Sequence, residues 1–207
     1  MRRIRGEMIL HERSEGKRDS MLMERLYSYN VDPMIPKISE TRLLLDNIRS
    51  VHNVGSIFRI ADTIGISKIY CLGTTPTPLD RFGRKRNDFT KVSLGTEETV
   101  PWEHLDSTER TIKKLKKENF VVIALEQTAR SVDYKNILKA LDERVKSGKA
   151  SRPEIKLLII FGNEVDGVNQ KLLNQSNIVA DIPMKGKKES LNVAVAAGIF
   201  LYRILDV

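Results

Sequence analysis

The sequence predicts an α/β protein with an open, mainly parallel sheet and helices on both faces. From Thr41 onward, short apolar runs alternate with longer amphipathic segments. The runs are rich in Val, Ile and Leu, as is typical of strands covered on both faces of a parallel sheet. Regular alternation of such strands with helices is typical of doubly wound α/β folds.

Five runs have the character of buried strands: Leu43–Leu45, Lys68–Gly73, Phe120–Leu125, Lys156–Phe161 and Ile178–Ile182. Five further segments have helical periodicity. These expected helices are Asn53–Ile64, Pro101–Asn119 with Pro101 in its first turn, Val132–Ser147, Gln170–Gln175 and Ser190–Leu205.

Residues 1–40 differ from the rest, so we predict a basic N-terminal extension over 1–40 and a single domain over 41–207. The extension is expected to hold a short helix over Ser20–Tyr29 and then a linker with prolines. Up to Tyr29 it has seven basic and five acidic residues. This balance slightly favours packing on the domain over contact with nucleic acid.

Composition limits the class of protein. Of 207 residues, 35 are Lys or Arg and 27 are Asp or Glu, a formal charge of +8 that suits a polyanionic partner. The lone cysteine, Cys71, excludes an intrachain disulfide and fits a cytoplasmic location. The three histidines are scattered, so no metal site is expected, and no apolar run is long enough to predict a membrane span.

In open parallel sheets, ligands bind beyond the carboxyl ends of the strands. The loop after the first predicted strand, Asp46–Arg59, has Asn53 placed to cap the next helix and Gly55 to allow close backbone approach. Arg59 lies next to the apolar face of that helix. It either forms a salt bridge or contacts a phosphate or a developing alkoxide, and the pattern leaves both open.

The loop after the fourth predicted strand, Phe161–Val168, has the sequence FGNEVDGV. Backbone N–H groups in such glycine-containing turns can hold a cofactor. The loop is neither a P-loop nor a GxGxxG motif, which disfavours nucleoside triphosphates and ordinary dinucleotides. Taken alone, it is more simply interpreted as a polar turn that caps the next helix.

The loop after the fifth predicted strand, Ile182–Val193, has the sequence IPMKGKKESLNV. Its lysines make it basic, and Ser190 is expected to cap the last helix. That helix is apolar on nearly every side, which predicts a subunit interface as well as a core contact.

Together these three loops resemble the motifs of the SpoU/TrmH family of SPOUT methyltransferases, over Thr41–Leu205. The matching residues are Asn53, Gly55 and Arg59, then Gly162-Asn163-Glu164 with Gly167, and finally Ile182-Pro183-Met184 with Ser190-Leu191-Asn192-Val193. Ala194 stands where many relatives have serine.

The resemblance implies an enzyme that transfers a methyl group from S-adenosylmethionine to a ribose 2′-hydroxyl of tRNA or rRNA. It also implies a C-terminal trefoil knot and a homodimer with an RNA site built from both subunits. The residues expected around the cofactor are Gly162, Asn163, Ile182, Met184, Gly186 and Leu191. Arg59 would be the catalytic arginine, and the residues around it would be Asn53, Glu164, Ser190 and Asn192.

A 2′-hydroxyl is a poor nucleophile until its proton is removed or the alkoxide is stabilised. The family proposal makes the arginine the base, whereas a guanidinium with a pKa above ~12 is effectively always charged. We therefore interpret Arg59 as a cation that holds a phosphate and stabilises the developing oxyanion.

A second basic segment, RFGRKR, follows the second predicted strand and includes Phe82 as a candidate stacking ring. The residues expected to contact RNA are Arg81, Arg84, Lys85, Arg86 and Lys91. The alternative is a solvated loop. Three other functions stay open: a knotted RNA-binding protein without catalysis, methylation of an RNA base, and a small-molecule enzyme.

Overall fold

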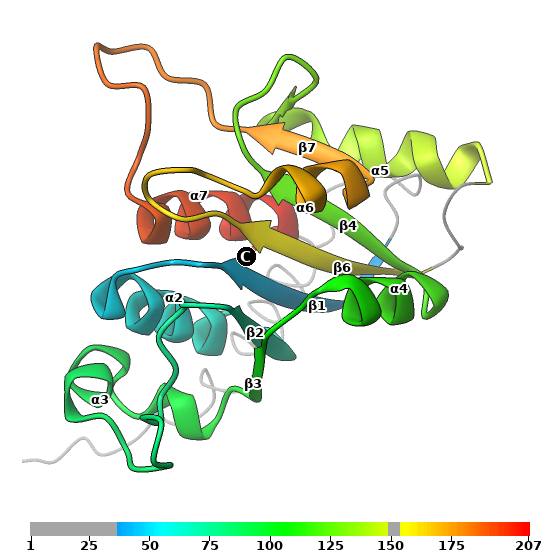
Figure 1. The fold of residues 1–207 in the computed structure, drawn as a ribbon. Helices are drawn as coiled ribbons and strands as arrows, with labels where there is room; N and C mark the ends of the chain where they lie inside the picture. Colours follow the sequence, from blue (N-terminus) through cyan, green and yellow to red (C-terminus); the bar gives the residue numbers. More distant parts are fainter. Residues whose placement is uncertain (1–36, 149–153) are drawn as a thin grey trace, which may run out of the picture. The chain divides into compact units, whose positions relative to one another are not determined.

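A computed structural model describes residues 37–148 and 154–207. Its centre is a seven-stranded sheet in the order β3-β2-β1-β6-β4-β7-β5, with all described pairs parallel (Figure 1). The strands are β1 (Lys37–Asp46), β2 (Lys68–Leu72), β3 (Trp102–Leu105), β4 (Phe120–Leu125), β5 (Val132–Asp133), β6 (Glu154–Phe161) and β7 (Ile178–Asp181). The predicted open parallel sheet is confirmed. The knot implied by the resemblance stays a prediction.

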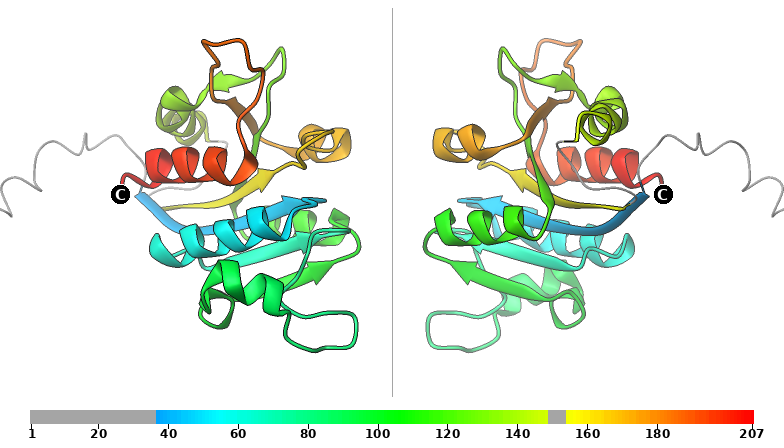
Figure 2. Two further views of the ribbon diagram at one scale, coloured as in Figure 1. Left: turned by 90° about the vertical axis from the view of Figure 1, so that its left-hand side faces the viewer. Right: turned by 90° about the vertical axis from the view of Figure 1, so that its right-hand side faces the viewer.

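Helices cover both faces of the sheet, as predicted (Figure 2). One face carries α2 (Val51–Thr63), α3 (Asn87–Ser93), α5 (Ile137–Lys146) and α7 (Val193–Leu205). The other carries α4 (Glu109–Lys117) and α6 (Gln170–Gln175). Side chains alternate along each strand, so Leu43 and Ile159 join the first core while Leu44 and Ile160 join the second.

The central strands β1 and β6 are the most deeply buried part of the sheet. Their register pairs Leu43 with Ile159 and Leu45 with Phe161, and all four side chains are at most 1% exposed. This alignment brings the carboxyl ends of β1 and β6 to the same edge of the sheet, on the left in Figure 1. The loops that follow both strands therefore begin side by side.

Two predicted helices begin more than one turn later than expected, and α7 begins at Val193 instead of Ser190. The segment after Pro101 is strand β3, because Trp102–Leu105 pairs with β2 and the Ile69 N–H donates to the Pro101 carbonyl. Val132–Asp133 likewise pairs with β7 as β5, and a 3₁₀ turn (Tyr134–Asn136) precedes α5. Both are edge pairings made by very short segments, for which sequence periodicity gives little signal.

β1 begins at Lys37, so it includes residues that the sequence analysis assigned to the N-terminal extension. The helix predicted over Ser20–Tyr29 lies outside the described residues. Within the described ranges, no helix is long and apolar enough to cross a membrane. In the same ranges, no three His, Cys, Asp or Glu side chains gather in a way that could hold a metal ion.

Candidate active site

A cavity of about 450 Å³ lies at the carboxyl edge of the sheet. Its walls come from the loops after β4, β6 and β7 and from the start of α7. The lining residues are Leu125, Glu126, Gln127, Phe161, Gly162, Asn163, Glu164, Val165, Gly167, Asp181, Ile182, Met184, Glu189, Ser190, Leu191, Asn192, Val193 and Ala196. Its size is within the roughly 300–1,000 Å³ of small-molecule sites.

Most residues that the sequence placed around a cofactor line this cavity. They are Gly162, Asn163, Ile182, Met184 and Leu191, and Glu164, Ser190 and Asn192 lie in the same wall. Gly186 does not line it, and a Cβ at that position would meet no atom within 4 Å. The two motif loops that follow β6 and β7 therefore meet in one place.

Glu164, Asn53 and Asn192 join the three predicted motifs in one hydrogen-bonded chain. Asn53 Nδ2 donates to Glu164 Oε1 at 2.6 Å, and Asn192 Nδ2 donates to Asn53 Oδ1 at 2.9 Å. Each residue comes from a different loop, so the chain fixes the relative positions of the loops after β1, β6 and β7.

The helix caps differ from those predicted. Ser50, not Asn53, caps α2, because its Oγ accepts from the Asn53 N–H. Asn192, not Ser190, caps α7: its Oδ1 accepts from the N–H groups of Ala194 and Val195. Asn192 thus uses its oxygen for the helix and its nitrogen for Asn53. This double use of one amide depends on tertiary contacts that the sequence pattern does not reveal.

Glu164 is an acceptor held by three donors. Besides Asn53, the N–H groups of Arg49 and Ser50 donate to its two oxygens at 3.1 and 3.3 Å. Burial raises the pKa of Glu164, but these hydrogen bonds together lower it by more. The pKa of Glu164 therefore lies below the ordinary carboxyl value. A carboxylate in this state is a weak base, and its hydrogen bonds fasten the first loop to the loop after β6.

Two more carboxylates hold the loop after β6 on the sheet. Glu126 Oε2, at the end of β4, accepts from the Val168 N–H at 2.7 Å. Asp46 Oδ2, which is buried at the end of β1, accepts from the Asn169 N–H at 2.8 Å. The sequence analysis missed Glu126 and its neighbour Gln127, although both follow a predicted strand at the same edge. Because ligands bind beyond the carboxyl ends of parallel strands, the position of these two residues directly after β4 would have indicated them.

The turn itself requires glycine. A Cβ on Gly162 would lie 2.2 Å from the Gly167 carbonyl carbon and 2.3 Å from the Val168 nitrogen. Gly167 has a φ of +67°, and a Cβ there would lie 2.1 Å from Glu126 Oε2. Gly162 is therefore in close contact with the backbone of the same turn, and Gly167 with the Glu126 carboxylate. Neither position has room for a larger side chain.

Charge within the cavity is negative. Four acidic residues line it, Glu126, Glu164, Asp181 and Glu189, and the described lining contains no Lys or Arg. The lysines of the third loop are exposed and lie outside this lining. A cavity with this lining favours a cationic ligand.

Arg59 does not line the cavity of its own protomer. It is exposed and lies six residues beyond Asn53 on α2, which corresponds to about 9 Å along the axis and about 240° of rotation. Among the described residues Arg59 forms no ion pair and does not line the cavity, so the salt bridge is not formed, whereas contact with a phosphate or a developing alkoxide stays a prediction.

The basic loop predicted to contact RNA is largely neutralised by its own acids. Arg84, Lys85 and Arg86 form ion pairs with Asp80, Glu98 and Asp88, respectively. Arg81 instead lies over the Phe82 ring, which is 66% exposed. Lys91 is exposed on α3, a helix that the sequence analysis did not predict.

The amino-acid sequence that forms this site matches a known protein family. Residues 40–202 match the profile of the SpoU rRNA Methylase family, more than three quarters of the chain. The chain belongs to the SpoU methylase family. The predicted resemblance is thereby confirmed, and the three motifs that carried it are the ones joined by Glu164, Asn53 and Asn192.

Relatives and solved structures agree on the family and the fold. The chain is 28% identical over 174 residues to RlmB of Neisseria meningitidis, a 23S rRNA (guanosine-2′-O-)-methyltransferase. This match covers 83% of the chain and 61% of RlmB. The AdoMet-bound rRNA methyltransferase of Sinorhizobium meliloti is 28% identical, with a TM-score of 0.65 over 81% of this chain and 56% of that one.

A third comparison concerns the fold alone. The TrmH/SpoU tRNA-modifying enzyme of A. aeolicus superimposes with a TM-score of 0.64 at 21% identity, covering 90% of this chain and 82% of that one. The chain spans about three fifths of the length of the curated relatives that it matches.

Proposed function

We propose that the protein transfers a methyl group from S-adenosylmethionine to a ribose 2′-hydroxyl of tRNA or rRNA. The observation that carries this proposal is the single cavity in which the family's second and third motifs meet, joined to the first by Asn53. We also propose a cytoplasmic location, where tRNA and rRNA would be available for methylation.

The cavity fits the proposed cofactor. S-adenosylmethionine carries a positive sulfonium and a positive amino group, and four carboxylates line the space. Gly162 and Gly167 bring the backbone to the surface of the cavity, while Ile182, Met184 and Leu191 supply apolar walls. When bound, the cofactor would supply an electrophilic methyl group on sulfur. The protein's task is to present the ribose hydroxyl to that methyl group.

The reaction also requires a group that stabilises the developing alkoxide, and Arg59 is our candidate. Because a guanidinium keeps its proton, Arg59 holds a phosphate and the oxyanion by charge and leaves proton removal to another acceptor. Glu164, Ser190 and Asn192 line the cavity, and Asn53 lies behind them as the donor to Glu164.

A homodimer would bring Arg59 to the cavity. Val195, Ile199 and Tyr202 form a stripe along α7 and are 52%, 39% and 43% exposed. This stripe, spaced by four and three residues, is apolar enough to pack against a second copy. Since α7 packs beside α2, a partner seated here would lie next to Arg59. We therefore propose that the partner subunit's Arg59 completes each site.

Ile199→Arg is expected to dissociate the dimer, because it places a charge in the middle of the apolar stripe. Sedimentation of the variant should give a monomer with an unchanged circular dichroism spectrum. Methyl transfer should fall with the dimer fraction. Lys171→Arg, a conservative change on α6 away from the stripe, serves as the control. A dimeric and active Ile199→Arg variant would contradict this arrangement.

Glu164→Gln is expected to lower methyl transfer by about 10- to 100-fold, because the amide loses one acceptor oxygen for the N–H groups of Arg49 and Ser50. Loss of a charged hydrogen-bond partner costs about 1.5–3 kcal/mol. The low pKa of Glu164 means that it is charged throughout the neutral range, so the pH optimum should not move. A shifted pH profile would instead identify Glu164 as a proton acceptor.

The proposal is tested by mass spectrometry of nucleosides from total tRNA and total rRNA, with and without the gene. Loss of one 2′-O-methyl nucleoside is the expected result. Loss of a base-methylated nucleoside would replace ribose by base as the target. An unchanged nucleoside profile, together with no binding of S-adenosylmethionine by calorimetry, would favour the non-catalytic RNA-binding alternative.

A further inference from the structure

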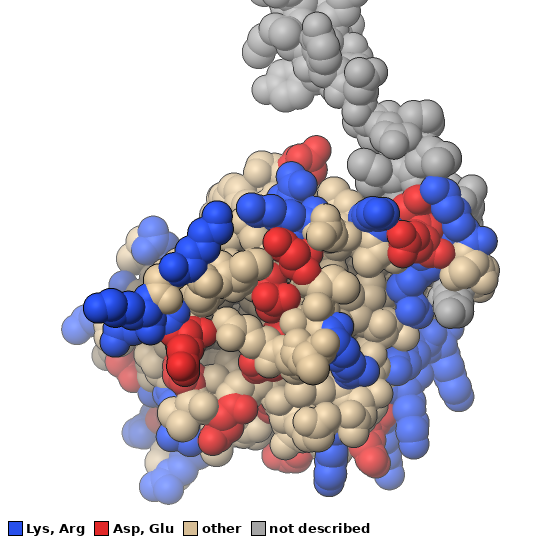
Figure 3. Space-filling model, turned by 90° about the horizontal axis from the view of Figure 1, so that it is seen from above, with Lys and Arg blue, Asp and Glu red and all other residues tan. Residues whose placement is uncertain are grey.

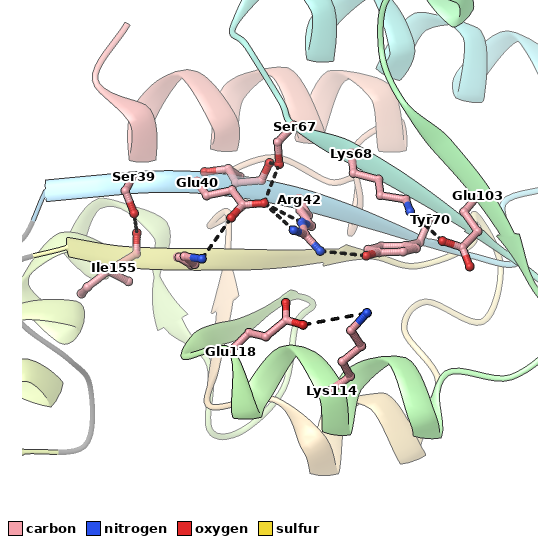
Figure 4. Close-up of polar contacts among 12 residues, drawn as sticks. Ser39, Glu40, Arg42, Ser67, Lys68, Tyr70, Glu103, Lys114, Glu118 and Ile155 are labelled. Atoms are coloured by element: carbon pink, nitrogen blue, oxygen red, sulfur yellow. Dashed lines mark hydrogen bonds and ion pairs between the residues drawn. The ribbon is translucent and has the colours of Figure 1, made fainter.

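Three lysines of α4 have no ion-pair partner among the described residues. Lys113, Lys116 and Lys117 are exposed on a helix whose buried residues are Ile112 and Leu115. Three neighbouring cations are paired, as Figure 4 shows: Arg42 with Glu40, Lys68 with Glu103, and Lys114 with Glu118. No described acidic side chain therefore neutralises these three lysines, whereas the cations drawn in Figure 4 each have a carboxylate partner.

Arg144 is a further cation without an ion-pair partner among the described residues, on α5, which covers the other face of the sheet. Its Nε is buried and has no hydrogen-bond partner. Desolvation lowers the pKa of Lys116, and repulsion from the Arg144 guanidinium lowers it further. A buried guanidinium donor without a partner is costly unless an acceptor such as an anion reaches it.

A small pocket lies where this anion could sit. It has a volume of about 230 Å³ and is lined by Arg130, Val132, Ala140, Arg144, Ser176, Asn177, Ile178 and Val179, with no acidic residue among them. β5 pairs with β7 only at Ala180 and Asp181, so the edge of β7 before these residues stays open. The two arginines therefore flank an open stretch of strand edge.

We propose that Lys113, Lys116, Lys117, Arg130 and Arg144 form a basic surface that binds backbone phosphates of the substrate RNA. This inference rests on the proposed function, because that function makes RNA the partner of the chain. The surface borders the start of β7, whereas the cavity borders its end at Asp181 and Ile182. A four-residue strand spans about 13 Å, so one RNA could reach both sites along this edge.

Charge on the surface of the molecule supports the proposal. Figure 3 shows Lys and Arg side chains gathered along the side of the molecule on which α4 and α5 lie in Figure 1. Phosphates suit this surface because a guanidinium can offer several donors to one anion; Arg144 has its donors available, and Arg130 has those that are not used by the Leu173 carbonyl. By contrast, three cations of the loop after β2 form ion pairs with nearby carboxylates of the same chain.

The salt dependence of RNA binding tests this surface. In the full chain, Lys113→Gln/Lys116→Gln/Lys117→Gln should flatten the slope of log K against log salt by about two units, since each phosphate contact contributes about 0.7–0.9. The matched control, Arg84→Gln/Lys85→Gln/Arg86→Gln, removes the same charge from the paired loop and should change the slope by less than half as much. Total tRNA and total rRNA are the probes.

Arg144 provides a second measurement. Arg144→Gln should weaken RNA binding about tenfold, and Arg144→Lys, which keeps the charge, should recover part of the loss, with melting temperatures alike in both variants.

An unchanged slope in the lysine triple variant, or equal losses of affinity for RNA and for polyglutamate, would overturn the proposal. If the wild type binds and methylates RNA while the triple variant keeps its slope, this inference alone fails. Absence of RNA binding by the wild type would refute the proposed function.

Discussion

Arg59→Ala is expected to lower methyl transfer by about 10²- to 10³-fold while leaving the affinity for S-adenosylmethionine unchanged. The loss corresponds to removal of one preorganised group at a developing oxyanion. The affinity is preserved because Arg59 is not in the wall of the cavity. Single-turnover transfer to RNA and calorimetric titration of the cofactor measure the two effects separately.

Two further variants test the role and the subunit of origin of Arg59. Arg59→Lys should recover part of the activity with an unchanged pH optimum, and a shifted optimum would favour a proton-accepting role. Mixing Arg59→Ala with Glu164→Gln protomers creates mixed dimers in which one of two sites has both residues intact, if Arg59 acts on the partner's cavity. Random exchange should then restore about a quarter of wild-type activity. No restoration would place Arg59 and the cavity that it serves in one subunit.

The sheet and the three motif loops could be predicted because their signals are local. Phe120–Leu125 and Lys156–Phe161 are continuous apolar runs, and a run of that length between helices has few alternatives. Once the strands are ordered, the rule for carboxyl ends places their loops at one edge. Gly162 could be singled out for the same reason, since a turn directly after a buried strand leaves little room.

The parts that the sequence did not reveal depend on partners distant along the chain. Trp102–Leu105 becomes a strand because β2 offers it an edge, not because of its own periodicity. Asn192 takes over the cap of α7 because Asn53 lies within reach of its amide nitrogen. The ion pairs of Arg84, Lys85 and Arg86 equally require a folded loop, so a dense basic run indicated more free charge than the structure leaves.

Gly162→Ala is expected to lower the melting temperature by roughly 10 °C and to abolish binding of S-adenosylmethionine. The new Cβ would lie 2.2 Å from the Gly167 carbonyl carbon and 2.3 Å from the Val168 nitrogen, so it meets backbone, which no side-chain rotation can relieve. Overpacking of this kind costs about 3 kcal/mol, and each kcal/mol corresponds to about 2–4 °C in a domain of this size.

The same clash also acts on the cavity. To make room, the turn would have to move away from β6, and the hydrogen bonds that fasten it would stretch: Val168 to Glu126 and Asn169 to Asp46. Glu164 is part of this turn, so its contact with Asn53 would be displaced with it. Gly186→Ala is the matched control, because its Cβ would meet nothing within 4 Å and should leave melting temperature and cofactor binding unchanged. A Gly162→Ala variant that melts like the wild type and binds the cofactor would contradict a cavity wall formed by close backbone packing at this turn.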